Sequence, residues 1–184
     1  MTPPWHESQS EMLDESHERT FRIEIVHASE TTAGRVAVRI ALETSPSDDI
    51  DLWLPSLAPS GEVWKRFSCD DYEWHEFCRL YHLELQARKC QCERLRSLAH
   101  KRSLILTYQA GDARHNVAVA MKQHLEHLEC KRRYDAGWII GGLTWPVTEE
   151  IERCGGLWFA RHKAWTMPNH ETWKYIHSLL PGDF

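Results

Sequence analysis

The segment that most constrains the fold spans residues 103–128. An apolar run rich in β-forming residues, Leu104–Tyr108, is followed by a short polar turn and then by a helical pattern. In that pattern apolar residues recur every three or four positions and predict one buried face, made of Val117, Met121, Leu125 and Leu128. A strand, turn and helix in this order are typical of an α/β sheet, in which ligands bind at the carboxyl ends of the strands. The segment therefore predicts a central strand and a candidate site at residues 108–112.

Two more strands and two helices are predicted before this segment. Residues 21–26 alternate apolar and charged side chains, and residues 35–40 place Val36, Val38 and Ile40 on one face. A long helix begins at Asp70 or Asp71, and residues 90–99 continue as a second, more charged helix. The predicted fold is α/β, a small sheet flanked by helices in a three-layer, Rossmann-like arrangement.

From residue 137 the composition changes, with five tryptophans in fewer than fifty residues. The local patterns predict a compact β-α-β-β-α unit, with a first strand at residues 143–147 and a hairpin at residues 157–167. We therefore expect a flexible tail at residues 1–20, an α/β domain at residues 21–133 and a Trp-rich C-terminal module at residues 137–184.

Charge and composition narrow the class of protein. The formal net charge of -5 and the pI near 6.2 argue against strong non-specific binding of nucleic acid by the whole chain, though a local basic patch remains compatible with them. No apolar run approaches the roughly 20 residues of a membrane span, and no signal-peptide pattern is present. The six cysteines lack the spacing of a disulfide framework. We expect a cytoplasmic protein with free thiols and no membrane contact.

A series of short motifs gives a family resemblance over residues 21–129. In order along the chain they are Arg22-Ile23, Gly34-Arg35-Val36, Trp53-Leu54 with Leu57-Ala58-Pro59-Ser60, Lys65-Arg66-Phe67, Trp74 with Glu76-Phe77, Tyr81 with Glu84-Leu85, and Leu106-Thr107-Tyr108 with Asp112-Ala113-Arg114-His115-Asn116. This part of the chain resembles the YeaO-like family, domain of unknown function 488. The resemblance implies a small three-layer α/β domain, and it implies no reaction, because the biochemical role of the family is not established.

The chain departs from that family at two strand ends. Members usually follow the second strand with Asp-Arg-x-Trp-Pro-Arg-Gly, whereas this chain has Arg39-Ile40-Ala41-Leu42-Glu43-Thr44-Ser45. The family's Ala-Lys-Asp turn is replaced by Ala110-Gly111-Asp112. Both changes remove charged groups, which favours a degenerate, non-catalytic member.

The C-terminal module resembles a second small family, a Trp-rich module of unknown function found in plasmid and DNA-processing proteins. The resemblance rests on residues 154–158 and 163–168. Its predicted hairpin places Arg161, His162 and Lys163 between Trp158 and Trp165. Cations beside aromatic rings are typical of sites for single-stranded nucleic acid or phosphate. The alternative is a solvated turn over a core packed with tryptophan.

A second candidate site consists of Asp112, His115 and Asn116, which follow the central strand. As catalytic groups they would supply an acid or base and a hydrogen-bond donor to a nucleotide or phosphodiester substrate. The structural alternative makes Asp112 the N-cap of the following helix and the other two side chains part of the loop. Burial of His115 against apolar neighbours would argue against the enzyme.

A metal site and a cofactor are not expected. His124, His127 and Cys130 recur every three residues, but nothing elsewhere supplies the convergent partners that a zinc site needs. A surface stripe with one buried cysteine is the preferred interpretation.

The preferred function is a non-enzymatic accessory protein that binds nucleic acid, DNA or RNA, or a protein partner through its C-terminal module, in a mobile-element or defence or counter-defence system. The alternative is an enzyme at the end of the central strand. A third hypothesis is a protein that only blocks a partner, for which exposed tryptophans would be the signature.

Overall fold

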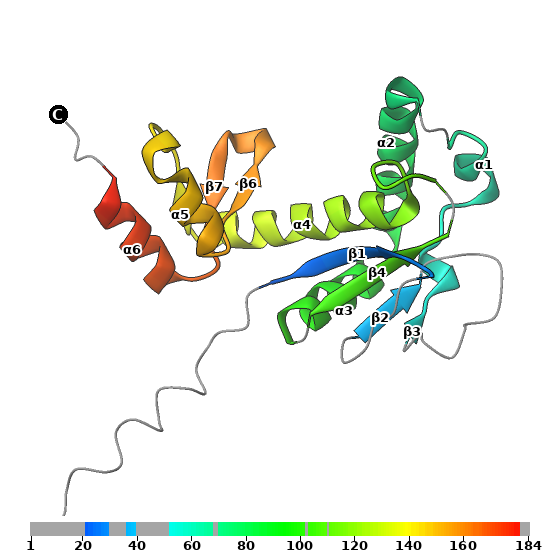
Figure 1. Ribbon diagram of the computed structural model, residues 1–184, viewed down its shortest axis with the longest axis horizontal. Helices are drawn as coiled ribbons and strands as arrows, with labels where there is room; N and C mark the ends of the chain where they lie inside the picture. Colours follow the sequence, from blue (N-terminus) through cyan, green and yellow to red (C-terminus); the bar gives the residue numbers. More distant parts are fainter. Residues whose placement is uncertain are drawn as a thin grey trace, which may run out of the picture.

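The computed structural model describes residues 21–29, 36–39, 52–67, 70–101, 103–109 and 111–180 (Figure 1). The predicted tail and the divergent stretch after the second strand lie outside these residues. Within them the chain combines six α-helices with one parallel and one antiparallel sheet. The predicted α/β class is thereby confirmed.

The first sheet has four parallel strands in the order β1-β4-β2-β3. Their bounds are β1 Ile23–His27, β2 Val36–Arg39, β3 Leu52–Trp53 and β4 Leu104–Tyr108. Strand β4 pairs on both sides, with Leu104 opposite Ile23 of β1 and Val36 of β2. Its residues Leu104, Ile105 and Leu106 are almost completely buried, as is usual for a strand covered on both faces. The predicted central strand is therefore correct.

The main core lies between one face of this sheet and four helices, three that come before β4 in the chain and one that comes after it. The helices are α1 Gly61–Trp64, α2 Asp71–Ala87, α3 Lys89–Lys101 and α4 Val117–Asp135, and a 3₁₀ turn, η1, spans Pro55–Leu57. Asp70 begins α2 as its N-cap, because its carboxylate accepts the backbone N–H groups of Tyr72 and Glu73. The buried stripe of α2 then packs with α4 and with Leu106 in one hydrophobic cluster.

The second sheet is antiparallel, in the order β5-β7-β6. Its elements are β5 Ile139–Ile140, η2 Trp145–Val147, α5 Thr148–Arg153, β6 Leu157–Phe159, η3 Ala160–His162, β7 Ala164–Thr166 and α6 His170–Leu179. The element order agrees with the predicted β-α-β-β-α unit, but the first strand was placed wrongly. Residues 145–147 form a 3₁₀ turn instead, because Pro146 has no N–H for a ladder and fits a first helical turn.

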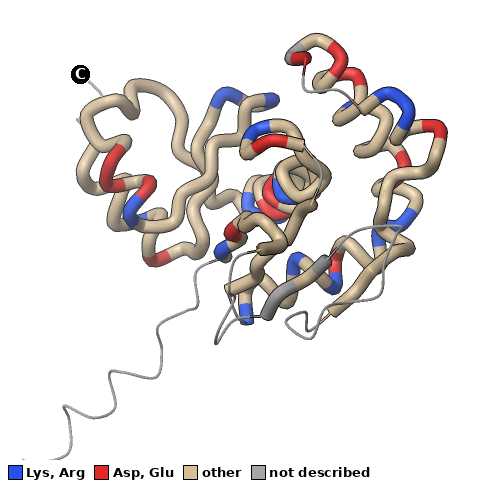
Figure 2. Tube along the Cα trace, turned by 45° about the vertical axis from the view of Figure 1, so that its right-hand side comes forward, with Lys and Arg blue, Asp and Glu red and all other residues tan. Residues whose placement is uncertain are grey.

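Helix α4 connects the two sheets (Figure 1). Figure 2, which looks nearly along this helix, shows acidic and basic residues adjacent within it. One buried group, Glu129, accepts hydrogen bonds from Arg132 and Arg133 of α4 and from two side chains of α3. Arg133 also donates to the backbone carbonyls of Gly155 and Thr166. This charge cluster therefore ties α3, α4 and the second sheet together.

Candidate nucleic-acid interface

The β6–β7 hairpin carries the residues that the sequence singled out. Trp158 of β6 lies directly opposite Trp165 of β7, so the two side chains share a face of the sheet. The η3 turn and Lys163 connect the two strands. Lys163 has a left-handed backbone conformation with φ 48°, which a lysine adopts at a cost that glycine avoids.

The two tryptophans have different surroundings. Trp165 lies in the middle strand and packs against the second core, around Ile140 and Met167. Trp158 lies on an edge strand and exposes 49% of its surface. The two rings meet at 64° with centroids 5.4 Å apart. Trp165 therefore supports the ring of Trp158, about half of whose surface is open to solvent.

The turn itself is basic, and it packs on helix α4. Arg161 and Lys163 are exposed and form no ion pair with any residue that the structure describes. His162 stacks on Tyr134 of α4, with centroids 4.0 Å apart and planes at 30°, and also contacts Phe159. All three predicted turn residues are thus exposed, and the ring of His162 also packs the turn on α4.

The opposite face of the hairpin packs on α4. Phe159 meets the rings of His127 and Tyr134 edge-on, at 5.5 Å and 5.9 Å. Neither Phe159 nor Tyr134 was among the predicted site residues. The alternation of side chains along β6 is the signal that separates Phe159, on the packed face, from Trp158 on the other. The α4 partner of Phe159 depends on tertiary packing.

The expected surface stripe on α4 is wrong for His124, which is buried, whereas His127 is exposed and Cys130 is buried as expected. The ring of His124 lies 5.3 Å from that of His82 on α2. Burial, with the nearby His82 and His127, lowers the pKa of His124 to about 4. Among the described residues no three His, Cys, Asp or Glu side chains are arranged to hold a metal ion.

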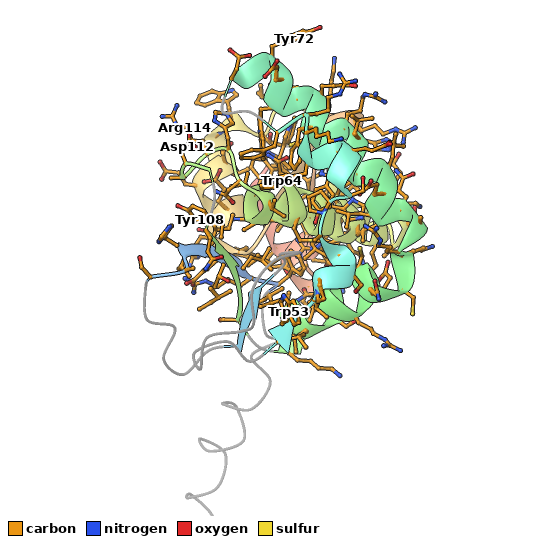
Figure 3. All side chains as sticks on the ribbon, turned by 90° about the vertical axis from the view of Figure 1, so that its right-hand side faces the viewer. Trp53, Trp64, Tyr72, Tyr108, Asp112 and Arg114 are labelled. Carbon is orange, nitrogen blue, oxygen red and sulfur yellow. The ribbon has the colours of Figure 1, made fainter. Side chains whose placement is uncertain are left out.

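The second candidate site lies at the end of β4 (Figure 3). Its Asp112 and Asn116 side chains form hydrogen bonds with backbone groups. The carboxylate of Asp112 accepts the backbone N–H groups of Arg114 and His115, both at 2.7 Å, and these bonds lower its pKa. The N-cap of α4 is Asn116, whose side chain accepts the N–H of Val119 and donates to the Asp112 carbonyl. The prediction that Asp112 caps α4 is therefore wrong.

His115 is turned away from solvent. Its side chain is 12% exposed, and its ring lies 5.2 Å from that of Trp74, which is itself buried. Its Nδ1 lies 3.3 Å from an oxygen of Asp112. An imidazole held between a carboxylate and an indole stabilises the loop, and this geometry gives the enzyme alternative no support.

The turn before this site is built around glycine. Gly111 has φ 95°, and a Cβ atom there would lie 2.0 Å from the carbonyl oxygen of His115. Only glycine fits without moving the backbone.

None of the helices in the described part of the chain is long and apolar enough to cross a membrane.

No curated protein and no solved structure gives a significant match to the sequence. A family model described as the inactive DUF488-N3 subclade matches residues 44–137, just over half of the chain. The match contains β4 and α4 and ends before the second sheet, so the resemblance of the C-terminal module remains a prediction. The expected membership of the YeaO-like family is confirmed, and the chain belongs to the inactive DUF488-N3 subclade.

Proposed function

We propose that this protein is a non-enzymatic accessory protein that binds single-stranded nucleic acid through the β6–β7 hairpin. The observation that carries the proposal is the open ring of Trp158 beside two cations, Arg161 and Lys163, that have no ion-pair partner among the described residues. A base stacks on an indole ring regardless of its identity, and the cations attract the phosphates on either side. The interface is small and local, which agrees with a chain whose net charge is negative.

The backbone conformation of the hairpin turn supports the same proposal. A non-glycine residue in the left-handed region costs roughly 1 kcal/mol, and such strain is concentrated at functional sites. Lys163 occupies that conformation at the tip of the hairpin. A lysine placed where glycine is more stable supplies a cation to the surface, and we take that cation to be its function.

The non-enzymatic part of the proposal rests on the second candidate site, at the end of β4. The family description names the subclade inactive. Asp112 and Asn116 use their side-chain oxygens to bind backbone N–H groups, and His115 is largely buried. Each of the three groups has a structural role, and the exposed one, Asp112, already binds two backbone N–H groups through its carboxylate.

The test is fluorescence anisotropy with labelled single-stranded, forked and fully double-stranded DNA, and with single-stranded RNA, at low and moderate salt. We expect binding to the strands with unpaired bases. Arg161→Glu combined with Lys163→Glu removes two phosphate contacts, so the slope of log K against log salt should fall by about 1.4. Trp158→Ala should weaken binding about fivefold to 150-fold, because stacking contributes about 1–3 kcal/mol per base.

Lys174→Glu is the matched control. Lys174 lies on α6 of the same unit and already pairs with Glu171, at 3.6 Å. Its reversal changes the net charge as one hairpin substitution does, and should leave the slope unchanged. The proposal is wrong if no strand binds at low salt, or if the hairpin variants bind as the unmodified protein does.

A protein partner is the second candidate, in the same accessory role. Leu143 and Trp145 expose 62% and 74% of their surfaces next to η2. Binding of nucleic acid that depends on Trp158 but not on Trp145 would favour the hairpin. The setting in a mobile-element or defence system is part of this proposal and follows from the resemblance of the module.

A further inference from the structure

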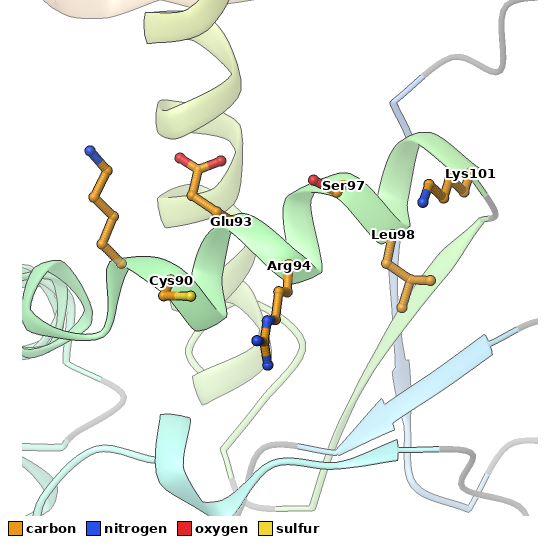
Figure 4. A pocket seen from close by; sticks show the side chains of 7 residues that line it. Cys90, Glu93, Arg94, Ser97, Leu98 and Lys101 are labelled. Atoms are coloured by element: carbon orange, nitrogen blue, oxygen red, sulfur yellow. The ribbon is translucent and has the colours of Figure 1, made fainter.

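A groove of about 740 Å³ runs along the outer face of α3. Figure 4 shows Cys90, Arg94 and Leu98 directed to the same side of the helix. Lys89 and Lys101 line its two ends. The groove therefore carries three cations and one carboxylate, Glu93, which is paired with Arg96 at 2.7 Å. Lys89 and Arg94 form no ion pair with a described residue, so an anionic occupant would meet two uncommitted cations.

The chain enters the described structure beside one end of this groove. The ring of Phe21 lies 5.3 Å from that of His100, and the backbone N–H of Arg22 bonds to the carbonyl of Ala99. His100 immediately precedes Lys101, the last residue that lines the groove. Phe21, where the described structure begins, thus lies next to the end of α3.

The composition of residues 1–20 is complementary to the groove. They contain five acidic residues and one arginine, hence a formal charge of −4. Four of the acidic residues fall within residues 11–18, close to the tether, and Trp5, Met12 and Leu13 supply apolar side chains. Twelve residues of α3 rise about 18 Å along the helix, whereas ten extended residues reach about 33 Å. The acidic stretch is long enough to cover the whole groove.

We propose that the acidic segment of residues 1–20 docks in the α3 groove of its own chain. Its carboxylates pair with Lys89, Arg94 and Lys101, and its apolar side chains cover Leu98 and Cys90. The proposal is independent of the hairpin and of what the hairpin binds. Because the tether raises the effective concentration of the segment, weak ion pairs are sufficient for docking.

Cys90 reports on the groove directly, because it is an exposed thiol within it. Docking slows its labelling by a maleimide, measured peptide by peptide with mass spectrometry. In the full chain with Glu11, Asp14, Glu15 and Glu18 changed to the corresponding amides, Cys90 should be labelled about fivefold faster at low salt. The full chain carrying Lys89→Glu and Arg94→Glu should show the same rate. At about 1 M salt the difference should vanish, because screening shortens to about 3 Å.

Three comparisons make the test specific. Cys154, in the other unit, should be labelled equally in all variants. Arg161→Glu with Lys163→Glu should leave Cys90 protected, since the hairpin plays no part. Carbodiimide coupling should join a carboxylate of residues 11–18 to Lys89 or Lys101, to an extent that does not vary with protein concentration.

The proposal is overturned if Cys90 is labelled equally fast with the neutralised and the unmodified segment, or if the segment couples to Lys163 instead. Protection that rises with protein concentration also overturns it, because the occupant would then belong to a second copy.

Discussion

Glu129 offers the sharpest test of how the two parts of the chain are joined. Its side chain is completely buried, and four cationic or ionisable groups donate to it within 2.9 Å, namely Arg96, His100, Arg132 and Arg133. Burial alone would raise the pKa of Glu129, but the hydrogen bonds from His100, Arg132 and Arg133 outweigh it and hold the pKa far below its ordinary range. Glu129 is therefore the carboxylate that all four of these groups share.

We predict that Glu129→Gln lowers the free energy of unfolding by about 3–5 kcal/mol, the usual cost of breaking a buried ion pair from one side. The amide keeps the shape but leaves Arg132 and Arg133 without the counter-charge, whereas Arg96 still pairs with Glu93. Since small domains are stable by only about 5–15 kcal/mol, this loss removes a large share of the total. Urea unfolding followed by tryptophan fluorescence measures it.

The matched control is Glu126→Gln, one turn earlier on the same helix. Glu126 is a third exposed, and its partner Lys122 lies 3.7 Å away. We expect a change below about 1 kcal/mol, because half-exposed pairs of this kind contribute little. Glu129→Gln with a loss as small as that of the control would refute the role given to the cluster.

Arg133→Met tests the same cluster from the other side. Arg133 is fully buried, and its Nη2 has no partner among the described residues. An arginine that already carries an unsatisfied N–H group gains less from its burial than Glu129 does. We therefore expect a smaller loss than for Glu129→Gln, and a double-mutant cycle between the two should give a coupling of about 1–3 kcal/mol.

Three further predictions concern the loop, the turn and the buried histidine. Gly111→Ala should destabilise the protein by about 2 kcal/mol, because the new Cβ atom would meet the His115 carbonyl. Thermal unfolding measures this loss, with Gly61→Ala as the control because a Cβ atom there meets nothing within 4 Å. Equal effects at the two positions would contradict the prediction. Lys163→Gly should stabilise the folded protein by about 1 kcal/mol and weaken its binding of single-stranded DNA. Urea unfolding measures the first effect and fluorescence anisotropy the second. Unchanged binding would contradict the binding role proposed for Lys163. The pKa of His124 is depressed to about 4 in the folded protein, so the unfolded chain binds more protons below about pH 6.5. Stability should therefore fall by up to about 3 kcal/mol between pH 6.5 and pH 4, and His124→Gln should flatten that dependence; an unchanged pH profile in the variant would exclude His124 as its source.

Local patterns determined much of this protein. The apolar run of β4 could be read directly, because a strand covered on both faces needs an uninterrupted row of apolar residues. The caps Ser60, Asp70 and Asn169 were also predictable, since a short polar side chain before a helix satisfies an unpaired N–H group. The hairpin was visible from its spacing and from the basic residues between two tryptophans. In each case the information lies within a few neighbouring residues.

Other features depend on contacts between distant residues. The choice of Asn116 rather than Asp112 as the cap of α4 depends on the folded loop, in which the Asp112 carboxylate binds the Arg114 and His115 amides. The different exposure of Trp158 and Trp165 follows from the strand order, because β6 is an edge strand and β7 is the middle strand of its sheet. The cluster at Glu129 joins residues more than thirty positions apart and leaves no periodic trace in the sequence. A charge is stable in such a place only when partners from several elements meet around it, and only the tertiary fold brings them there.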